Sequence, residues 1–290
     1  MIAVRLQGRL GNQLFQYAFI YTAAKKLNTS FYIDQYIESF IADKYFQNLS
    51  HSSNRLAIKL FRITGFKNIF SYHLRRFYYG NLLFSHKYSM KIYGFSDKQN
   101  EVEIHNNTIY QGYFQSVLLI EPHEALLRQK FILKDRFVNE FKMKYGDLYN
   151  NNTIVTVHIR RTDYINVEHL NLGKNDISLP LSYYQNAIKE LNKQDVHFLF
   201  ISDDPEFVKE HFKQIVNKTI SIDNEIMDFQ HLMNAHICVI SNSTFSWWGA
   251  WLNSTKNKII YCPKYYLGYH LKKEIPCNIY PDEWKQIDVG

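Results

Sequence analysis

The chain has 290 residues, of which 46% are hydrophobic and 21% charged, so it has ample core material and needs neither a disulfide nor a metal to fold. Its net charge of +7 favours an anionic partner, whether nucleic acid, an anionic membrane face or a charged small molecule. Its three cysteines are odd in number and form no C-x-x-C pair, which argues against a disulfide framework and a zinc site.

The first half of the chain follows the strand and helix order of an α/β protein. A short apolar strand at residues 2–6 leads through a glycine turn into a helix over residues 12–27. A second short strand is expected at residues 31–33. A returning strand at residues 108–113 and helical structure over residues 122–149 complete this half.

Residues 35–108 contain a basic, aromatic-rich stretch, at residues 62–93, whose elements are hard to assign. Helices with a solvated basic face are one interpretation of this stretch. The alternatives are an acceptor-binding subdomain and a peripheral docking surface for an anionic membrane.

A polar break at residues 149–152 marks the expected domain boundary, with an N-terminal lobe at residues 1–150 and a C-terminal lobe at residues 151–290. Apolar strands and amphipathic helices alternate beyond the break, as in the parallel, doubly wound sheet of a nucleotide-binding domain. The strands are expected at residues 154–159, 196–201, 219–222, 237–241 and 258–262, and the helices at residues 182–191, 205–212, 227–235 and 245–252.

The sharpest motif runs from His158 through Arg160, Arg161 and Asp163, at the end of an apolar strand. Ligands of open α/β sheets bind beyond the carboxyl ends of the strands. A guanidinium forks onto a phosphate with two parallel hydrogen bonds, so two adjacent arginines favour an anionic ligand. We expect one arginine to meet the ligand and the other a structural carboxylate such as Asp163. A plain surface pair of arginine and aspartate is the alternative.

A second motif, Asn242-Ser243-Thr244-Phe245, joins an apolar strand to an aromatic helix. The first N–H groups of that helix and the two hydroxyls would make a phosphate cradle. The alternative is an ordinary N-cap followed by a buried aromatic face, and both can hold together.

A third motif, Gly8-Arg9-Leu10-Gly11-Asn12-Gln13, follows the first strand. Its glycines would let the backbone approach a ligand at the start of a helix. It is neither a dinucleotide fingerprint nor a Walker loop, and such glycines often only make a turn.

Acidic residues follow two further strands. Asp203 or Asp204 can cap the helix that Pro205 begins, and Asp228 can either cap the next helix or accept hydrogen bonds from guanine. The chain has no D-x-D motif and no acidic triad with metal spacing, so we expect no metal site. Arginine side chains would then neutralise a departing diphosphate.

These motifs together closely resemble the α-1,2-fucosyltransferase family, glycosyltransferase family 11, of bacterial type. The resemblance spans nearly the whole chain in order and is poorest at about residues 35–107. Arg9 stands where most members have a second glycine. The matching segments are residues 4–8, residues 10–18, residues 158–164, residues 201–204 and residues 241–249.

The resemblance implies a GT-B-like fold of two Rossmann-like lobes, with the donor site in the C-terminal lobe and no metal. It implies that Arg160 meets the diphosphate, that His158 lies near the nucleotide and that Asp228 reads guanine. Arg160, His158 and Asp163 are therefore the expected catalytic residues. The expected donor-binding residues are Gly11, Asn12, Gln13, Arg160, Arg161, Asp203, Asp228, Asn242, Ser243, Thr244 and Phe245.

The function that the resemblance implies is transfer of L-fucose from GDP-β-L-fucose, with inversion, to O2 of a terminal β-galactoside in surface polysaccharide or lipopolysaccharide synthesis. No cofactor is expected besides this donor substrate. A fucosyltransferase of another linkage, such as the α-1,6 type, is one alternative, and a non-catalytic basic nucleotide- or nucleic-acid-binding protein is another. Because the chain shows no signal peptide and no long apolar run, we expect a cytoplasmic enzyme, with contact at the inner membrane face as a further option.

Overall fold

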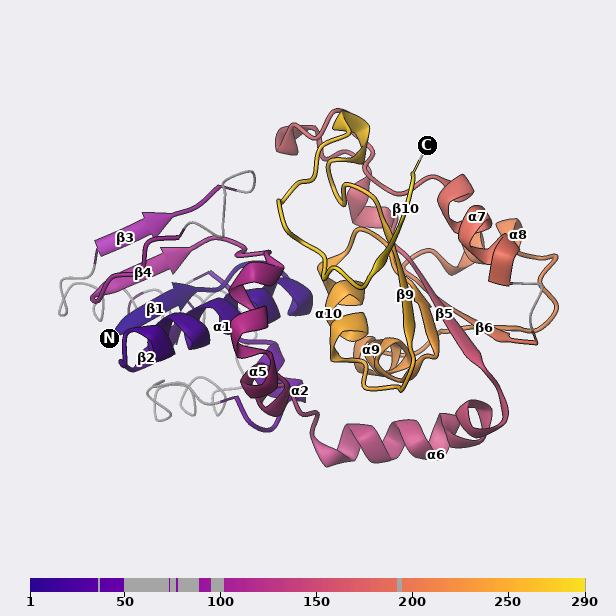
Figure 1. Cartoon of the computed structure of the whole chain (residues 1–290), viewed down its shortest axis with the longest axis horizontal. Helices are drawn as coiled ribbons and strands as arrows, with labels where there is room; N and C mark the ends of the chain where they lie inside the picture. The colour runs from indigo at the N-terminus through magenta and orange to yellow at the C-terminus, as the bar shows by residue number, and fades with distance from the viewer. Residues whose placement is uncertain are drawn as a thin grey trace. The chain divides into compact units, whose positions relative to one another are not determined.

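The computed structural model describes residues 1–35, 37–49, 73, 77, 89–94, 102–191 and 195–289. The chain forms two compact units, Met1–Ile132 and Leu133–Gly290 (Figure 1). Most of the basic stretch at residues 62–93 lies outside the described residues, so both proposed roles for it remain predictions.

The first unit is built on a parallel four-stranded sheet in the order β2-β1-β4-β3. The buried strand β1 (Ile2–Arg5) pairs with β2 (Phe31–Asp34) on one side and β4 (Thr108–Gln111) on the other. β3 (Ser89–Ile92), which the sequence did not predict, pairs with β4. The strand order reverses between β1 and β4.

Helix α1 (Leu10–Lys26) covers this sheet. It is buried over most of its length, because its own apolar residues occupy almost all of its faces. Phe19 stacks on Phe114 with ring centroids 3.9 Å apart. Lys25 and Lys26 lie in the last turn, where positive charge opposes the helix dipole favourably. Among the described residues of the unit, the short elements are α2 (Ala42–Tyr45), η2 (Val117–Leu119), η3 (Glu121–His123) and α5 (Glu124–Lys130).

The single helical segment expected at residues 122–149 is in fact interrupted at residues 131–134, between α5 and α6 (Asp135–Asn151). The division between the compact units also falls there. α6 belongs to the second unit because it packs on a histidine of α9 (Glu225–Asn234): Phe141 lies edge-on to the ring of His231 at 5.0 Å. The units therefore divide before α6, whereas the boundary expected after residue 150 falls at the end of that helix.

The second unit contains a parallel six-stranded sheet in the order β10-β9-β8-β5-β6-β7. All five strands expected in this half are present. A short sixth strand, near the C-terminus of the chain, is added at one edge of the sheet. The strands are β5 (Ile154–Ile159), β6 (His197–Ser202), β7 (Lys218–Ile220), β8 (Ile237–Val239), β9 (Ile259–Pro263) and β10 (Lys285–Ile287).

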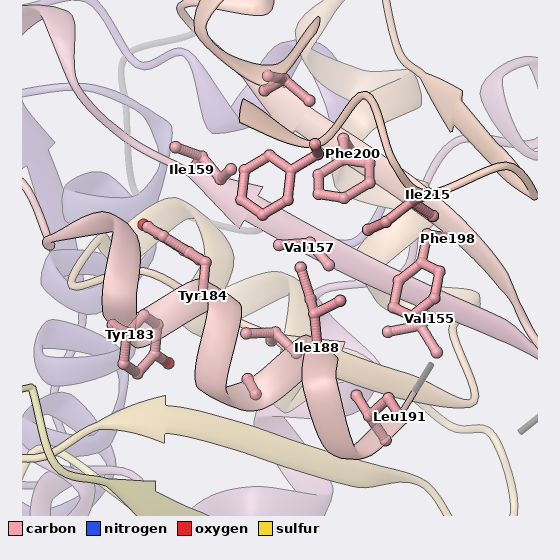
Figure 2. Packing of buried hydrophobic residues seen from close by; sticks show 14 of the residues in the cluster. Val155, Val157, Ile159, Tyr183, Tyr184, Ile188, Leu191, Phe198, Phe200 and Ile215 are labelled. Atoms are coloured by element: carbon pink, nitrogen blue, oxygen red, sulfur yellow. The ribbon is translucent and has the colours of Figure 1, made fainter. Parts of the chain in front are cut away.

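Helices cover both faces of this sheet: α7 (Leu181–Leu191) and α8 (Pro205–His211) lie on one face, with α9 and α10 (Thr244–Leu252) on the other (Figure 1). Alternate residues of β5 face opposite sides, as a pleated strand requires. Val155, Val157 and Ile159 enter the cluster formed with α7 and β6 (Figure 2). The remaining elements are the one-turn helices η4 (Thr162–Tyr164), η5 (Glu168–Leu170) and η6 (Tyr269–Leu271).

Candidate active site

The predicted motifs of the second unit meet at the point where the strand order of its sheet reverses. From β5 the chain runs outward through β6 to β7, and it then returns as β8 on the other side of β5. Ligands of doubly wound sheets bind beyond the carboxyl ends of the strands at such a point. The loops that follow β5 and β8 are therefore the expected binding elements.

A hydrogen bond joins these two loops across the reversal: Nδ1 of His158, at the end of β5, lies 2.8 Å from Oγ of Ser241, just beyond β8. The imidazole is only 4% exposed and lies beside the ring of Phe245, with centroids 5.6 Å apart. Burial, helped by the nearby Arg160 charge, lowers the pKa of His158 from its usual 6.5 to about 3. His158 is thus a neutral, buried link between the loops.

Arg160 follows directly and lies among carboxylates. Its Nε donates to Oδ1 of Asp163 at 2.7 Å, and its Nη2 donates to the second oxygen of the same carboxylate. Nε also lies 3.4 Å from Oδ2 of Asp203. The side chain keeps 18% of its surface exposed, so it remains accessible from solvent.

Asp203, at the end of β6, fastens the loop that carries both arginines. Its carboxylate accepts the backbone N–H of Arg161 at 2.9 Å, the N–H of Thr162 at 3.1 Å and the Thr162 hydroxyl at 2.6 Å. Burial alone would raise the pKa of Asp203, but these donors and the Arg160 charge outweigh it and hold the pKa below its usual range. Asp203 is therefore a fixed anion.

Arg161 points to the neighbouring helix. Its Nε donates to Oδ2 of Asp204 at 3.3 Å, and its guanidinium lies 3.8 Å from the ring centroid of Phe207. Asp204 caps α8 by accepting the N–H of Phe207, which confirms the predicted cap. Both arginines thus have a carboxylate partner, where the sequence predicted a carboxylate for only one of them.

The loop after β8 is buried and ordered by its own polar groups. Ser243 caps α10 by accepting the N–H of Phe245 at 3.3 Å, as one interpretation of the sequence predicted. Asn242 donates to the Ile177 carbonyl at 2.8 Å, while its Oδ1 is buried without a hydrogen-bond partner among the described residues. Thr244, the first residue of α10, is half-buried. A buried acceptor such as Oδ1 of Asn242 destabilises the fold unless a ligand or a water donates a hydrogen bond to it.

Tyr164 and Ile177 are contributors whose roles the sequence did not predict. The Tyr164 hydroxyl donates to the carbonyl of Asn242 at 3.0 Å, which ties the loop after β5 to the loop after β8. The partners are 78 residues apart in the chain, so only the strand order brings them together. In the sequence, the position of Tyr164 inside the arginine motif was the feature that could have indicated a role for it in the site.

Asp228 lies in the first turn of α9, which Asn224 caps instead. The Ser221 hydroxyl donates to its carboxylate at 2.5 Å. Burial raises the pKa of Asp228 to about 7, with Ser221 opposing the rise and Asp223 and Glu225 adding to it. Such a carboxyl changes charge near neutral pH and can accept from N–H donors when ionised.

The glycine loop of the first unit has a tight internal structure. Gly8 has φ of +77°, and a Cβ there would lie 2.4 Å from Nδ2 of Asn12. The wholly buried Gln13 donates to the carbonyls of Gly8 and Ser39 and accepts the N–H of Ile41 at 2.7 Å. Gln13 thus holds the loop in shape.

Gly11 and Asn12 lie in the first turn of α1, which begins at Leu10. Oδ1 of Asn12 accepts a hydrogen bond of 3.0 Å from Nε2 of Gln115, a residue that the sequence did not single out. Gly11 is buried. Beneath the loop, Arg5 and Asp34 form a buried ion pair at 2.8 Å across neighbouring strands, which the sequence also did not predict.

The described residues contain no group of three or more histidine, cysteine, aspartate or glutamate side chains placed to hold a metal ion. No helix among them combines the length and apolarity needed to cross a membrane.

Comparison with known proteins gives consistent matches over the whole chain. The sequence model of Glycosyl transferase family 11 matches residues 1–288. WbnK, an O-antigen biosynthesis glycosyltransferase of Escherichia coli, is 27% identical over 300 residues, which cover 92% of this chain and 96% of the relative. An alpha-1,2-colitosyltransferase of Escherichia coli is also 27% identical, over 99% of both chains.

Among solved structures, NodZ alpha-1,6-fucosyltransferase soaked with GDP-fucose matches with a TM-score of 0.55 and 14% identity, covering 89% of this chain and 96% of that chain. At this identity the likeness shows the fold. Together with the two parallel sheets, it confirms the expected α/β fold of two Rossmann-like lobes of GT-B-like type.

Proposed function

The chain belongs to glycosyl transferase family 11, and from this we propose that it transfers L-fucose from GDP-β-L-fucose, with inversion, to O2 of a terminal β-galactoside. The observation that carries the proposal is the link between His158 and Ser241, which brings an arginine loop and a capped helix start together at the reversal of the sheet. That combination suits a nucleoside diphosphate sugar.

In this proposal the phosphates bind between the two loops of the second unit. Arg160 binds the β-phosphate, and Ser243, Thr244 and the first N–H groups of α10 bind other phosphate oxygens. Arg161 and Asp203 hold the arginine loop in position. The Oδ1 of Asn242, which has no hydrogen-bond partner among the described residues, accepts a hydrogen bond from the bound GDP-fucose.

Nucleobase recognition is proposed for α9 and the start of α10. Ionised Asp228 would accept hydrogen bonds from N1–H and the amino group of guanine. Phe245, which packs on Phe229 of α9 at 5.3 Å, supports this side of the donor. The role in donor binding expected for Gly11, Asn12 and Gln13 of the first unit stays a prediction, and Gln13 keeps their loop in shape.

The proposed reaction is a single displacement at the fucose anomeric carbon. The acceptor hydroxyl oxygen forms the new bond while the bond to the β-phosphate oxygen breaks and GDP leaves. Arg160 offsets the charge that grows on the departing phosphate. A base takes the proton of the acceptor hydroxyl, and Asp163 is the more exposed candidate. His158 positions Ser241 instead, because it is buried and its pKa lies near 3.

A second candidate donor has specific support from one relative. The matched colitosyltransferase is named for an alpha-1,2 linkage and for colitose. Colitose is the 3-deoxy form of L-fucose. Family membership is equally compatible with a colitosyl donor. Recognition of the 3-hydroxyl separates the two donors, since a site built to bond a hydroxyl strongly rejects an analogue without it.

The setting that we propose is surface polysaccharide or lipopolysaccharide synthesis at the cytoplasmic side of the membrane. WbnK, the matched glycosyltransferase, is named for O-antigen biosynthesis. Peripheral contact with the membrane remains a proposal. No role in nucleic-acid binding is proposed.

The test incubates the full chain with GDP-fucose or a colitosyl donor and a panel of β-galactosides. We expect acceptor-dependent release of GDP, a product whose linkage is α-1,2 by nuclear magnetic resonance, and full activity in EDTA. An α-1,6 product would contradict the proposed α-1,2 linkage but would leave the assignment as a fucosyltransferase in place. No acceptor-dependent release with any donor, or release only with added divalent ion, would overturn the proposal as stated.

A further inference from the structure

Ser221 lies at the carboxyl end of the edge strand β7, and the sheet holds its backbone in place. Its N–H donates to the carbonyl of Phe200 in β6 at 2.8 Å, which continues the ladder of hydrogen bonds past Ile220. The residue is only 5% exposed. The Ser221 hydroxyl therefore occupies a fixed position beside the first turn of α9.

This hydroxyl uses both its donor and its acceptor capacity. It donates to Oδ1 of Asp228 at 2.5 Å, and its oxygen accepts the backbone N–H of Asp223 at 3.3 Å. Because the N–H of Asp223 occupies a lone pair of the oxygen, the hydroxyl proton is directed to the Asp228 carboxylate.

Helix α6 holds the turn that supplies this N–H group. The ammonium of Lys144 donates to one oxygen of the Asp223 carboxylate, and the hydroxyl of Tyr145 donates to the other. The Asp223 side chain is 12% exposed. A continuous set of hydrogen bonds thus runs from α6 through Asp223 and Ser221 to Asp228.

We propose that Ser221 is a positioning residue for nucleobase recognition, whose hydroxyl holds the Asp228 carboxylate in the orientation that accepts N1–H and the 2-amino group of guanine. The inference rests on the proposed function, because it takes GDP as the ligand and Asp228 as the reader of the base. Asp228 is half-buried, and Ser221 is the one described residue that donates to its carboxylate. Each carboxylate oxygen has two lone pairs, so Oδ1 can keep the Ser221 bond while the carboxylate accepts from guanine.

The same hydrogen bond affects the charge of Asp228. The titratable side chains on the turn after β7, on α9 and on α6 are, around this carboxyl, Asp223, Glu225, His231, Lys144 and Tyr145. The neighbouring α10 carries none. Burial raises the pKa of Asp228 to about 7, the Ser221 hydroxyl opposes the rise, and Asp223 and Glu225 add to it. Loss of the hydroxyl would therefore raise this pKa further, so the carboxyl would become protonated at a higher pH.

Ser221→Ala removes the hydroxyl without adding volume. We expect the affinity for GDP at pH 7 to fall by about tenfold, as for loss of a hydrogen bond to a charged group. The pH at which affinity begins to fall should move upward. The preference for GDP over inosine diphosphate, which lacks the 2-amino group, should shrink, because a misoriented carboxylate no longer accepts from both guanine donors.

Thr219→Val is the matched control, because it removes a hydroxyl from the same strand while keeping the shape of the side chain. The Thr219 hydroxyl lies 2.8 Å from Nε2 of His197 and has no printed part in the contacts of Asp228. We expect this control to leave the GDP affinity, its pH dependence and the preference between the two nucleotides unchanged. Thermal melting of both variants checks that they are folded.

Calorimetric titration of the full chain with GDP and with inosine diphosphate, from pH 6 to pH 9, separates the outcomes. Failure of the unaltered protein to bind GDP would reject the proposed function itself. GDP binding with a preference over inosine diphosphate that Ser221→Ala leaves intact would reject the positioning role and leave the function standing. Equal weakening for both nucleotides without a shift in pH dependence, or the same losses in Thr219→Val, would assign the effect to general packing and also reject the positioning role.

Discussion

Arg160 is the side chain on which the proposed chemistry depends most. We expect Arg160→Ala to reduce kcat by about a hundredfold or more, since it removes a preorganised cation at the departing phosphate. Arg160→Lys should recover only part of this loss, because an ammonium lacks the fork. Steady-state kinetics with GDP-fucose measure both, with Arg128→Ala, an exposed pair with Glu124, as control. Near-normal turnover in Arg160→Ala would remove the donor role.

Asp228 gives the donor affinity a dependence on pH. Its pKa of about 7 means that the carboxyl becomes protonated as the pH falls below 7, and a protonated carboxyl no longer accepts two guanine donors. GDP affinity should therefore fall by up to about tenfold per pH unit below that point. Titrations from pH 5.5 to 8 measure it. Asp228→Asn should bind weakly at every pH, and an unchanged slope in that variant would contradict the assignment.

For individual residues, the sequence predicted contacts between side chains of one motif and missed contacts between residues that are distant in the chain. The pairing of Arg160 with Asp163 was foreseeable, because Asp163 lies only three positions after Arg160. The bond between His158 and Ser241 spans 83 residues. It depends on β5 and β8 being neighbours, which local pattern cannot specify.

The packing of α9 against α10 depends on a single glycine. A Cβ at Gly249 would lie 2.6 Å from Cβ of Leu232, so we expect Gly249→Ala to destabilise the second unit by about 1–3 kcal/mol. Gly146→Ala is the matched control, because a Cβ there meets nothing within 4 Å, and it should stabilise α6 by about 0.5–1 kcal/mol. Urea unfolding measures both. Equal effects of the two changes would contradict the packing argument.

Among elements, the sequence predicted those with a strong period and missed those defined by their neighbours. β5 and β6 are rich in apolar residues, and both were expected within a residue of their observed bounds. β3 has mostly exposed residues and exists by pairing with β4. The break between α5 and α6 has no glycine or proline to announce it, since it reads Phe-Ile-Leu-Lys at residues 131–134.

For the whole molecule, the alternation of strands and helices sufficed to predict two α/β lobes, and the domain boundary was the less predictable feature. The polar run at residues 149–152 resembles a linker in composition, yet Tyr149 bonds His231 of α9 at 2.9 Å. α6 is therefore fastened to the second unit at its far end. Composition reports solvent exposure, whereas a boundary depends on which unit a helix contacts.

The acid stability of the second unit depends on two buried histidines and one partly buried aspartate, whose effects on stability oppose each other. His158 and His231 have folded pKa values near 3 against an ordinary 6.5, so the unfolded state binds their protons first and stability falls as the pH drops below 6.5. Asp228, at about 7 against 3.8, binds its proton first in the folded state, so it adds stability over the same fall. Near pH 5, each histidine gains about one proton on unfolding and Asp228 loses about one. Unfolding should therefore take up about one proton net through these three groups.

The four tryptophans all lie in this unit, so their fluorescence follows its unfolding in urea as a function of pH. Asp228→Asn removes the opposing group, and the loss of stability between pH 6 and pH 4.5 should then steepen towards two protons. His231→Gln should flatten it instead, because it removes one of the two histidines that resist protonation in the folded state. Stability profiles of the two variants that run parallel to the unaltered protein would show that these three groups do not control the acid response.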